Sequence, residues 1–106
     1  MITEKQFEAQ IKDLAKLFGY TYYHTWRSIH SPSGWPDCVF ARLEPEPKFI
    51  IAELKTDDLK NSQPSFEQYA WLYLLQHLGK PHGIMGFDAW LWRPSDFDTE
   101  IVEVLR

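Results

Sequence analysis

The sequence predicts a single mixed α/β domain in which helices flank a small central sheet. Runs rich in β-branched and aromatic residues, which favour strands, alternate with stretches whose apolar residues recur every three or four positions, as in amphipathic helices. The chain has 106 residues, of which 44% are hydrophobic, so residues 1–106 can bury one modest core and are expected to form one domain.

An amphipathic helix is predicted over residues 4–18, with Thr3 as a suitable N-cap and Gly19 as a suitable C-terminal stop. The stretch 20–26 is rich in strand formers and is predicted to be the first strand, followed by a loop over residues 27–35. The apolar stripe of the helix consists of Phe7, Ile11, Leu14, Ala15 and Phe18.

The middle of the chain predicts a β-hairpin. Cys38–Ala41 and Phe49–Lys55 both read as strands, and the two prolines of Glu44–Pro47 cannot continue a ladder because proline has no N–H to donate. If the strands pair about a turn centred on Pro45, Asp37 lies directly opposite Glu53.

The second half of the chain predicts a helix, two short strands and a terminal helix. Ser65 and Gln68 have the spacing of a capping box, which opens a helix that ends at Gly79. Its buried side is expected to carry Tyr69, Leu72, Leu75 and Leu78. The closing strands are predicted at residues 82–87 and 89–92, and the last helix starts at Pro94-Ser95. The predicted order is therefore α-β-β-β-α-β-β-α.

The acids of the hairpin form a candidate metal site. Like charges that face each other across a sheet are destabilising unless something positive lies between them, and a divalent cation meets that need. Asp37, Glu53 and the carbonyl of Leu54 offer the oxygen ligands that Mg²⁺ prefers. Strand alternation places Lys55 on the face of Glu53, roughly 7 Å further along, where it could orient or deprotonate a water. This combination suits phosphodiester hydrolysis.

Two acids of the first helix are further candidates for this site. At 100° per residue, Glu4 falls within about 40° of the centre of the apolar stripe and Glu8 about 80° from it. Both could instead complement the helix dipole. The dipole interpretation is favoured for Glu8, whereas both interpretations stay open for Glu4.

Other chemistry is less well supported. The histidines are scattered without zinc spacing, although His24 and His30 flank the loop before Asp37 and one of them could contact a phosphate. Trp90 and Trp92 could stack on bases, but alternating aromatics in a short strand more often pack in a core. Cys38 reads as a small buried thiol.

Net charge and targeting signals limit the partners and the cellular location that we expect for the chain. The net charge of −4 argues mildly against a nucleic-acid partner, yet the acids of a metal site contribute to it. No signal peptide or long apolar run is evident, so a cytoplasmic location without a membrane partner is expected. Local basic groups remain at Arg27, Arg42, Lys48, Lys55 and Lys60.

Three motifs together resemble the PD-(D/E)XK nuclease superfamily, and more narrowly its VRR-NUC branch of small stand-alone phage and bacterial proteins. They are Gly34-x-Pro36-Asp37, Glu53-Leu54-Lys55 and Ser65-x-x-Gln68. The resemblance extends over nearly the whole chain, from the helix that starts at Thr3-Glu4 to Trp92-Arg93-Pro94. It implies a restriction-endonuclease-like mixed central sheet flanked by helices.

The resemblance also implies roles for individual residues. Asp37 and Glu53 would bind Mg²⁺ or Mn²⁺, and Lys55 would assist the nucleophile. The family's helix glutamate best matches Glu4, with Glu8 as the competing assignment. A family glutamine near the start of the helix behind the site matches Gln68, whose capping role with Ser65 could hold as well. Trp35 and Cys38 depart from the family pattern, but neither is a charged position of the site.

The function implied by the resemblance is a metal-dependent endonuclease that hydrolyses DNA, with branched, flapped or junction DNA as the leading substrate. Similarity to Holliday-junction resolvases implies a homodimer, and a targeting protein could assist so small and acidic a domain. Two other hypotheses stand beside it: a non-catalytic nucleic-acid-binding or assembly module that keeps the nuclease fold, and a structural domain whose acids are solvated.

Overall fold

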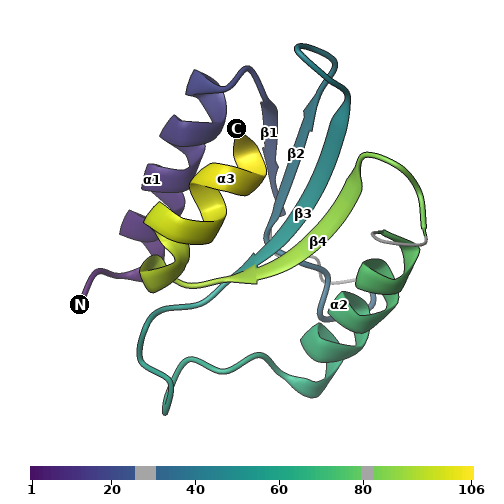
Figure 1. Cartoon of the computed structure of the whole chain (residues 1–106). Helices are drawn as coiled ribbons and strands as arrows, with labels where there is room; N and C mark the ends of the chain where they lie inside the picture. Colours follow the sequence, from purple (N-terminus) through teal and green to yellow (C-terminus); the bar gives the residue numbers. More distant parts are fainter. Residues whose placement is uncertain (26–30, 80–82) are drawn as a thin grey trace.

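The computed structural model, which describes residues 1–25, 31–79 and 83–106, has a mixed four-stranded sheet with helices on both faces (Figure 1). The strand order is β1-β2-β3-β4, in which β1, β2 and β3 are antiparallel neighbours and β4 runs parallel to β3. The elements are α1 (Glu4–Leu17), β1 (Thr21–His24), β2 (Cys38–Arg42), β3 (Lys48–Leu54), α2 (Phe66–Leu78), β4 (Phe87–Trp92) and α3 (Val102–Leu105).

The predicted hairpin register is confirmed. Val39 pairs with Ile51 and Cys38 with Ala52, so the next position outward sets Asp37 against Glu53. The first helix is confirmed as well, and Thr3 caps it through a reciprocal bond with Gln6.

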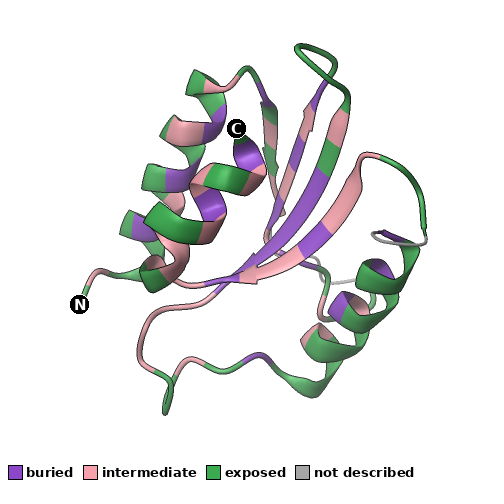
Figure 2. Ribbon diagram, viewed as in Figure 1, coloured by how far each residue is buried: buried purple, intermediate pink, exposed green. Residues whose placement is uncertain are grey.

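Strand β3 is the centre of the molecule and is buried on both faces. Ile50, Ala52 and Leu54 belong to the larger core cluster with α1 and α3, whereas Ile51 packs against α2. Figure 2 shows the buried residues concentrated along β3 and on the inner sides of the helices. Because side chains alternate along a strand, Glu53 falls on the α2 face with Ile51.

One of the two predicted closing strands is wrong. Among the described residues, 83–86 form bends and a turn, and a single strand, β4, follows. Gly86 has a φ of 80° in the left-handed region, which strands do not use, and the Phe87 N–H bonds back to the carbonyl of Ile84. His82 lies outside the described residues. The strand was predicted from the apolar residues Ile84 and Met85, but Gly83 and Gly86 on either side of them favour turns.

The burial predicted for α2 is correct for half of its stripe. Leu72 and Leu75 are buried, but Tyr69 and Leu78 are 49% and 45% exposed. The helix covers one face of a narrow sheet, so only the side chains that point directly at the sheet are buried. The predicted terminal helix begins with a 3-10 turn at Pro94–Asp96 and a π turn at Phe97–Ile101 before α3.

A buried arginine ties the two helices of the larger core together. Arg42 is 7% exposed and donates hydrogen bonds to the carbonyls of Phe18, Leu105 and Arg106. Carbonyls at helix C-termini lack intrahelical partners, so a buried cation there is well placed. Within the described ranges, no helix combines the length and the apolar character needed to cross a membrane.

Candidate active site

The predicted acids meet at the end of the sheet where β2 begins and β3 ends. Oδ2 of Asp37 accepts a hydrogen bond of 2.9 Å from the Leu54 N–H. The carbonyl of Asp37 accepts a bond of 2.7 Å from the Thr25 N–H, which extends the β1–β2 ladder by one rung. The backbone on both sides therefore fixes Asp37 against the last residues of β3.

Glu53 is an acid in the protein interior, with 1% of its surface exposed. Its Oε1 accepts a 2.6 Å hydrogen bond from Nε2 of Gln68 and lies 3.9 Å from Nζ of Lys55. No N–H or O–H group in the described part of the chain donates to Oε2, and the neighbouring carboxyl of Asp37 can do so only when one of the two acids is protonated. A buried carboxylate oxygen without a donor is costly, so this atom calls for a proton or a cation.

The electrostatics of Asp37 and Glu53 also favour a proton or a cation at this site. Burial is the largest cause that raises the pKa of Glu53, followed by the charge of Asp37 and the hydrogen bond between the two carboxyl groups. Lys55 opposes these effects and lowers the pKa. The acids thus resist simultaneous ionisation unless positive charge is supplied at the site.

Gln68 caps α2 and also contacts one of the hairpin acids. Its Oε1 accepts from the Ser65 N–H at 2.8 Å, and the Ser65 hydroxyl accepts from the Gln68 N–H at 3.1 Å, which completes the capping box. The amide nitrogen left over by the cap is the one that donates to Glu53. The start of α2 is thereby joined to the buried acid.

Both helix acids reach the site through a shared pocket of about 290 Å³, lined by Glu4, Lys5, Glu8, His24, Asp37 and Leu54. The pKa of Glu4 is raised by burial first and by the charge of Asp37 second, so Glu4 lies within the electrostatic reach of that acid. Glu8 is held by other partners: the Tyr22 hydroxyl at 2.5 Å and Nδ1 of His24 at 2.6 Å. These contacts favour Glu4 as the helix acid nearest the hairpin acids.

No pattern in the sequence predicts the cluster around Glu8. Potential ligand atoms of Glu8, His24 and Cys38 all lie within 4.8 Å of one another. However, the Tyr22 hydroxyl bridges Glu8 and Cys38, lying 3.4 Å from the sulfur, and burial raises the pKa of the thiol. A protonated thiol is a poor metal ligand, and sulfur is unsuited to Mg²⁺ or Mn²⁺. Strand alternation places Tyr22 and His24 on the side of the sheet that faces α1. Their contacts with Glu8 depend on how α1 packs against the sheet, which the sequence does not show.

The donor atoms at Asp37 and Glu53 are of the kind that suits a hard divalent cation. They are carboxylate oxygens, one of which is buried and accepts no bond from an N–H group of the described residues, and Leu54 lines the adjoining pocket. A Leu54 carbonyl ligand stays a prediction. His30 lies outside the described residues.

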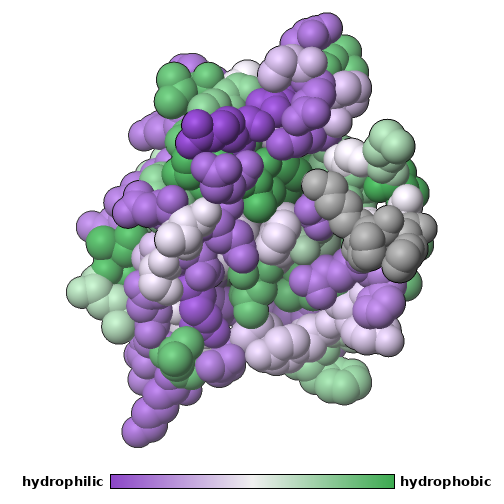
Figure 3. Space-filling model, viewed as in Figure 1, coloured by the Kyte–Doolittle hydropathy of each residue, from purple (hydrophilic) through white to green (hydrophobic). Residues whose placement is uncertain are grey.

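The remaining sequence candidates lie elsewhere. Trp92 is completely buried, which confirms core packing over base stacking, and Trp90 stacks beside it with ring centroids 6.4 Å apart. Hydrophilic and hydrophobic side chains are interspersed on the face that Figure 3 shows.

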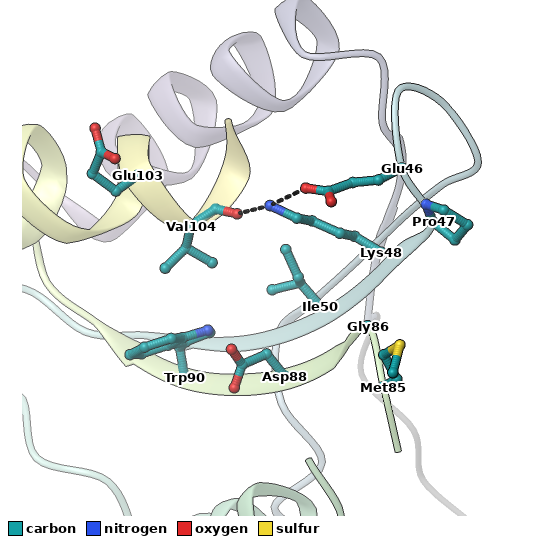
Figure 4. Close-up of a pocket in the computed structure, with 10 residues that line it drawn as sticks. All are labelled: Glu46, Pro47, Lys48, Ile50, Met85, Gly86, Asp88, Trp90, Glu103 and Val104. Atoms are coloured by element: carbon teal, nitrogen blue, oxygen red, sulfur yellow. Dashed lines mark hydrogen bonds and ion pairs between the residues drawn. The ribbon is translucent and has the colours of Figure 1, made fainter. Parts of the chain in front are cut away.

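A pocket of about 990 Å³ lies between α3 and the β3–β4 surface (Figure 4). Its lysine, Lys48, is engaged with Glu46 at 3.4 Å and with the carbonyl of Val104 at 3.1 Å. Neither hairpin acid is among its lining residues.

Comparison of the chain with protein-family models, with curated proteins and with solved structures gives no match. Any functional assignment therefore depends on the chemistry of the residues themselves.

Proposed function

We propose that this chain is a metal-dependent endonuclease with a restriction-endonuclease-like fold that hydrolyses phosphodiester bonds of DNA. The observation that carries the proposal is the pair formed by Asp37 and Glu53, in which Oε2 of Glu53 is buried and accepts no bond from an N–H group of the described residues. The adjacent ammonium of Lys55, 3.9 Å from Glu53, completes an acid–acid–lysine set of the kind that hydrolytic metal sites use.

Asp37 and Glu53 would hold Mg²⁺ or Mn²⁺, with the Leu54 carbonyl and Glu4 as further ligands. When bound, the cation supplies an acidified water and offsets negative charge on the phosphoryl group. Gln68 keeps the Glu53 carboxylate in one orientation by its 2.6 Å bond. The Leu54 N–H does the same for Asp37 at 2.9 Å.

Lys55 would orient the attacking water and donate to a non-bridging phosphate oxygen. Its side chain is 16% exposed and is steered toward the acids by the contact with Glu53. A cation held at this place stabilises charge that develops on the phosphate in the transition state.

The proposed substrate is branched, flapped or junction DNA, and the proposed assembly is a homodimer, because a junction presents two symmetric strands. A targeting protein would help an acidic domain to find such DNA.

The test is cleavage of labelled duplex, single-stranded, flapped and four-way-junction DNA in Mg²⁺ or Mn²⁺, comparing wild type with Asp37→Asn. Asparagine can still accept the bond from Leu54, so the variant changes charge with little change in shape. Asp13→Asn, at an exposed position of α1, is the matched control. Metal-dependent cutting that only Asp37→Asn abolishes supports the proposal.

A thermal-shift titration with Mn²⁺ separates the competing hypotheses. Stabilisation of wild type that Asp37→Asn loses is expected for the nuclease. DNA affinity that is insensitive to Asp37→Asn, without turnover, would indicate the non-catalytic module. Absence of both metal stabilisation and DNA binding would leave a structural domain.

A further inference from the structure

We propose that a second pocket, on the α2 side of Asp37, binds one unpaired nucleobase, so that the nuclease acts on a strand whose bases are unstacked beside the cleaved phosphate. This inference rests on the proposed function and narrows its substrate to single-stranded segments such as flaps and junction arms. The pocket has a volume of about 620 Å³, and its lining residues include Tyr23, Thr25, Ser31, Pro32, Trp35 and Trp71.

The aromatic walls are arranged as a corner. The rings of Trp35 and Trp71 are 5.1 Å apart and nearly perpendicular, at 79°. The Trp71 indole is held by a hydrogen bond of 3.1 Å from its Nε1 to the carbonyl of Ser33. A flat ring in this corner would stack on one indole and meet the other at an angle, and both are favourable aromatic geometries.

Two aromatic side chains of the pocket are more exposed to solvent than aromatic side chains of a core. Trp35 is 37% exposed and Tyr23 is 58% exposed. Large aromatic surfaces held open to solvent beside a proposed active site are typical of platforms on which bases stack.

The pocket is also continuous with the acids. Trp35 is two residues before Asp37, so their Cα atoms lie within about 7 Å of each other. Thr25 joins the two sites directly: its side chain lines the pocket and donates 2.9 Å to the Pro36 carbonyl, while its N–H bonds to Asp37.

Charge and shape favour a base over a phosphate or a duplex. The pocket residues are all uncharged, with hydroxyl groups at Thr25 and Ser31 that could bond a base edge. A paired base has its faces covered by its neighbours, and only an unpaired or flipped base can enter such a corner.

The pocket is preorganised by close packing behind it. At Gly34, a Cβ would lie 2.6 Å from the backbone of Glu67 in the first turn of α2. The loop that carries Trp35 is therefore fixed on the helix that carries Trp71, and little ordering is needed when a base binds.

The experiment measures binding without cleavage, by fluorescence anisotropy in EDTA, of a labelled oligothymidylate and of a duplex of equal length. The variants are Trp35→Ala, the conservative Trp35→Phe, and Tyr73→Ala, which removes a 67% exposed aromatic of α2 outside the pocket. We expect wild type to prefer the single strand. Trp35→Ala should weaken that binding by roughly 5- to 100-fold, as for the loss of one stacking partner. Trp35→Phe should retain most of the affinity, while Tyr73→Ala and duplex binding should be unchanged.

Thermal melts establish that each variant is folded, and Tyr23→Ala, at the rim, gives a second test if Trp35→Ala unfolds. Single-strand binding that none of the pocket variants weakens overturns the inference, as does equal weakening of duplex binding. The outcome is separate from the nuclease test. Trp35-dependent binding without cleavage would refute the nuclease alone, and cleavage that is insensitive to the pocket variants would refute the pocket alone.

Discussion

Nε2 of Gln68 donates a hydrogen bond of 2.6 Å to Oε1 of Glu53, which joins the first turn of α2 to the buried end of β3. The same amide accepts from the Ser65 N–H through its oxygen. The residue that starts the helix is thus also the residue that orients the acid, so the position of α2 and the geometry of the candidate metal site are linked.

Replacing Gln68 by glutamate should keep the cap and disrupt the site. Glutamate can accept from the Ser65 N–H, but its second oxygen faces Glu53 where a donor was. Because the pKa of Glu53 is raised to about 8, the comparison is made in EDTA at about pH 9, where both carboxylates are ionised. We expect the free energy of unfolding to fall there by about 1–3 kcal/mol, the cost of a buried carboxylate that has lost its donor. Urea denaturation measures it, and Mn²⁺ should restore the loss.

Gln6→Glu is the matched control, because Thr3 and Gln6 form a capping box with the same bond lengths of 2.8 and 3.1 Å at an exposed position. There an added acid in the first helical turn should change stability by less than about 0.5 kcal/mol. Equal losses in both variants would mean that the contact between Gln68 and Glu53 is unimportant.

The stability of the metal-free protein should depend on pH through Glu53. Burial, aided by the charge of Asp37, raises its pKa to about 8. An acid whose pKa is higher in the folded state stabilises the fold below its unfolded pKa, and this contribution is lost as the pH rises through the folded value. Between about pH 5 and about pH 9, wild type should therefore lose on the order of 4 kcal/mol relative to Glu53→Gln.

Urea denaturation of both proteins in EDTA at the two pH values measures this difference. Glutamine at position 53 can still accept from Gln68, so the comparison isolates the charge. Parallel pH profiles for the two proteins would exclude an ionising, buried Glu53.

The hairpin acids could be predicted because local rules determine them. The prolines of the turn and the alternation of the strands define one register, and that register sets Asp37 opposite Glu53. The capping box at Ser65 likewise depends on residues three apart and was readable from spacing alone.

Contacts that depend on docking could not be predicted. The network of Tyr22, Glu8 and His24 requires the approach of α1 to β1, for which no local pattern exists. The corner of Trp35 and Trp71 joins a loop to a helix far along the chain. The strand predicted ahead of Phe87 failed for a different reason, since Gly83 and Gly86 favour turns over a ladder among the described residues 83–86.

Cys38 should be chemically silent in the folded protein. Its side chain is completely buried, and burial raises the pKa of the thiol. We expect Ellman's reagent to modify it at least about 100-fold more slowly in buffer than in urea, where one thiol per chain should react at once. Fast modification of the native protein would instead indicate a reactive thiol and would favour a soft-metal site with Glu8 and His24.

Gly34→Ala should unfold or strongly destabilise the protein, because two separate constraints meet at this residue. Its φ of 95° is strained for a side chain, and an added Cβ would lie 2.6–2.8 Å from backbone and side-chain atoms of Glu67. Gly19→Ala is the matched control, since Gly19 has a φ of 84° but its nearest contact would be 3.8 Å away. In Gly19→Ala the backbone strain alone should lower the free energy of unfolding, by about 1 kcal/mol, whereas Gly34→Ala should lower it by a further amount of about 1–3 kcal/mol through overpacking.

Thermal and urea denaturation of the two variants measure this difference, which reports how tightly the loop before Asp37 is held on α2. Equal losses would mean that the loop can move away from the helix, and a mobile loop could not hold Trp35 and Asp37 in fixed positions for a substrate strand.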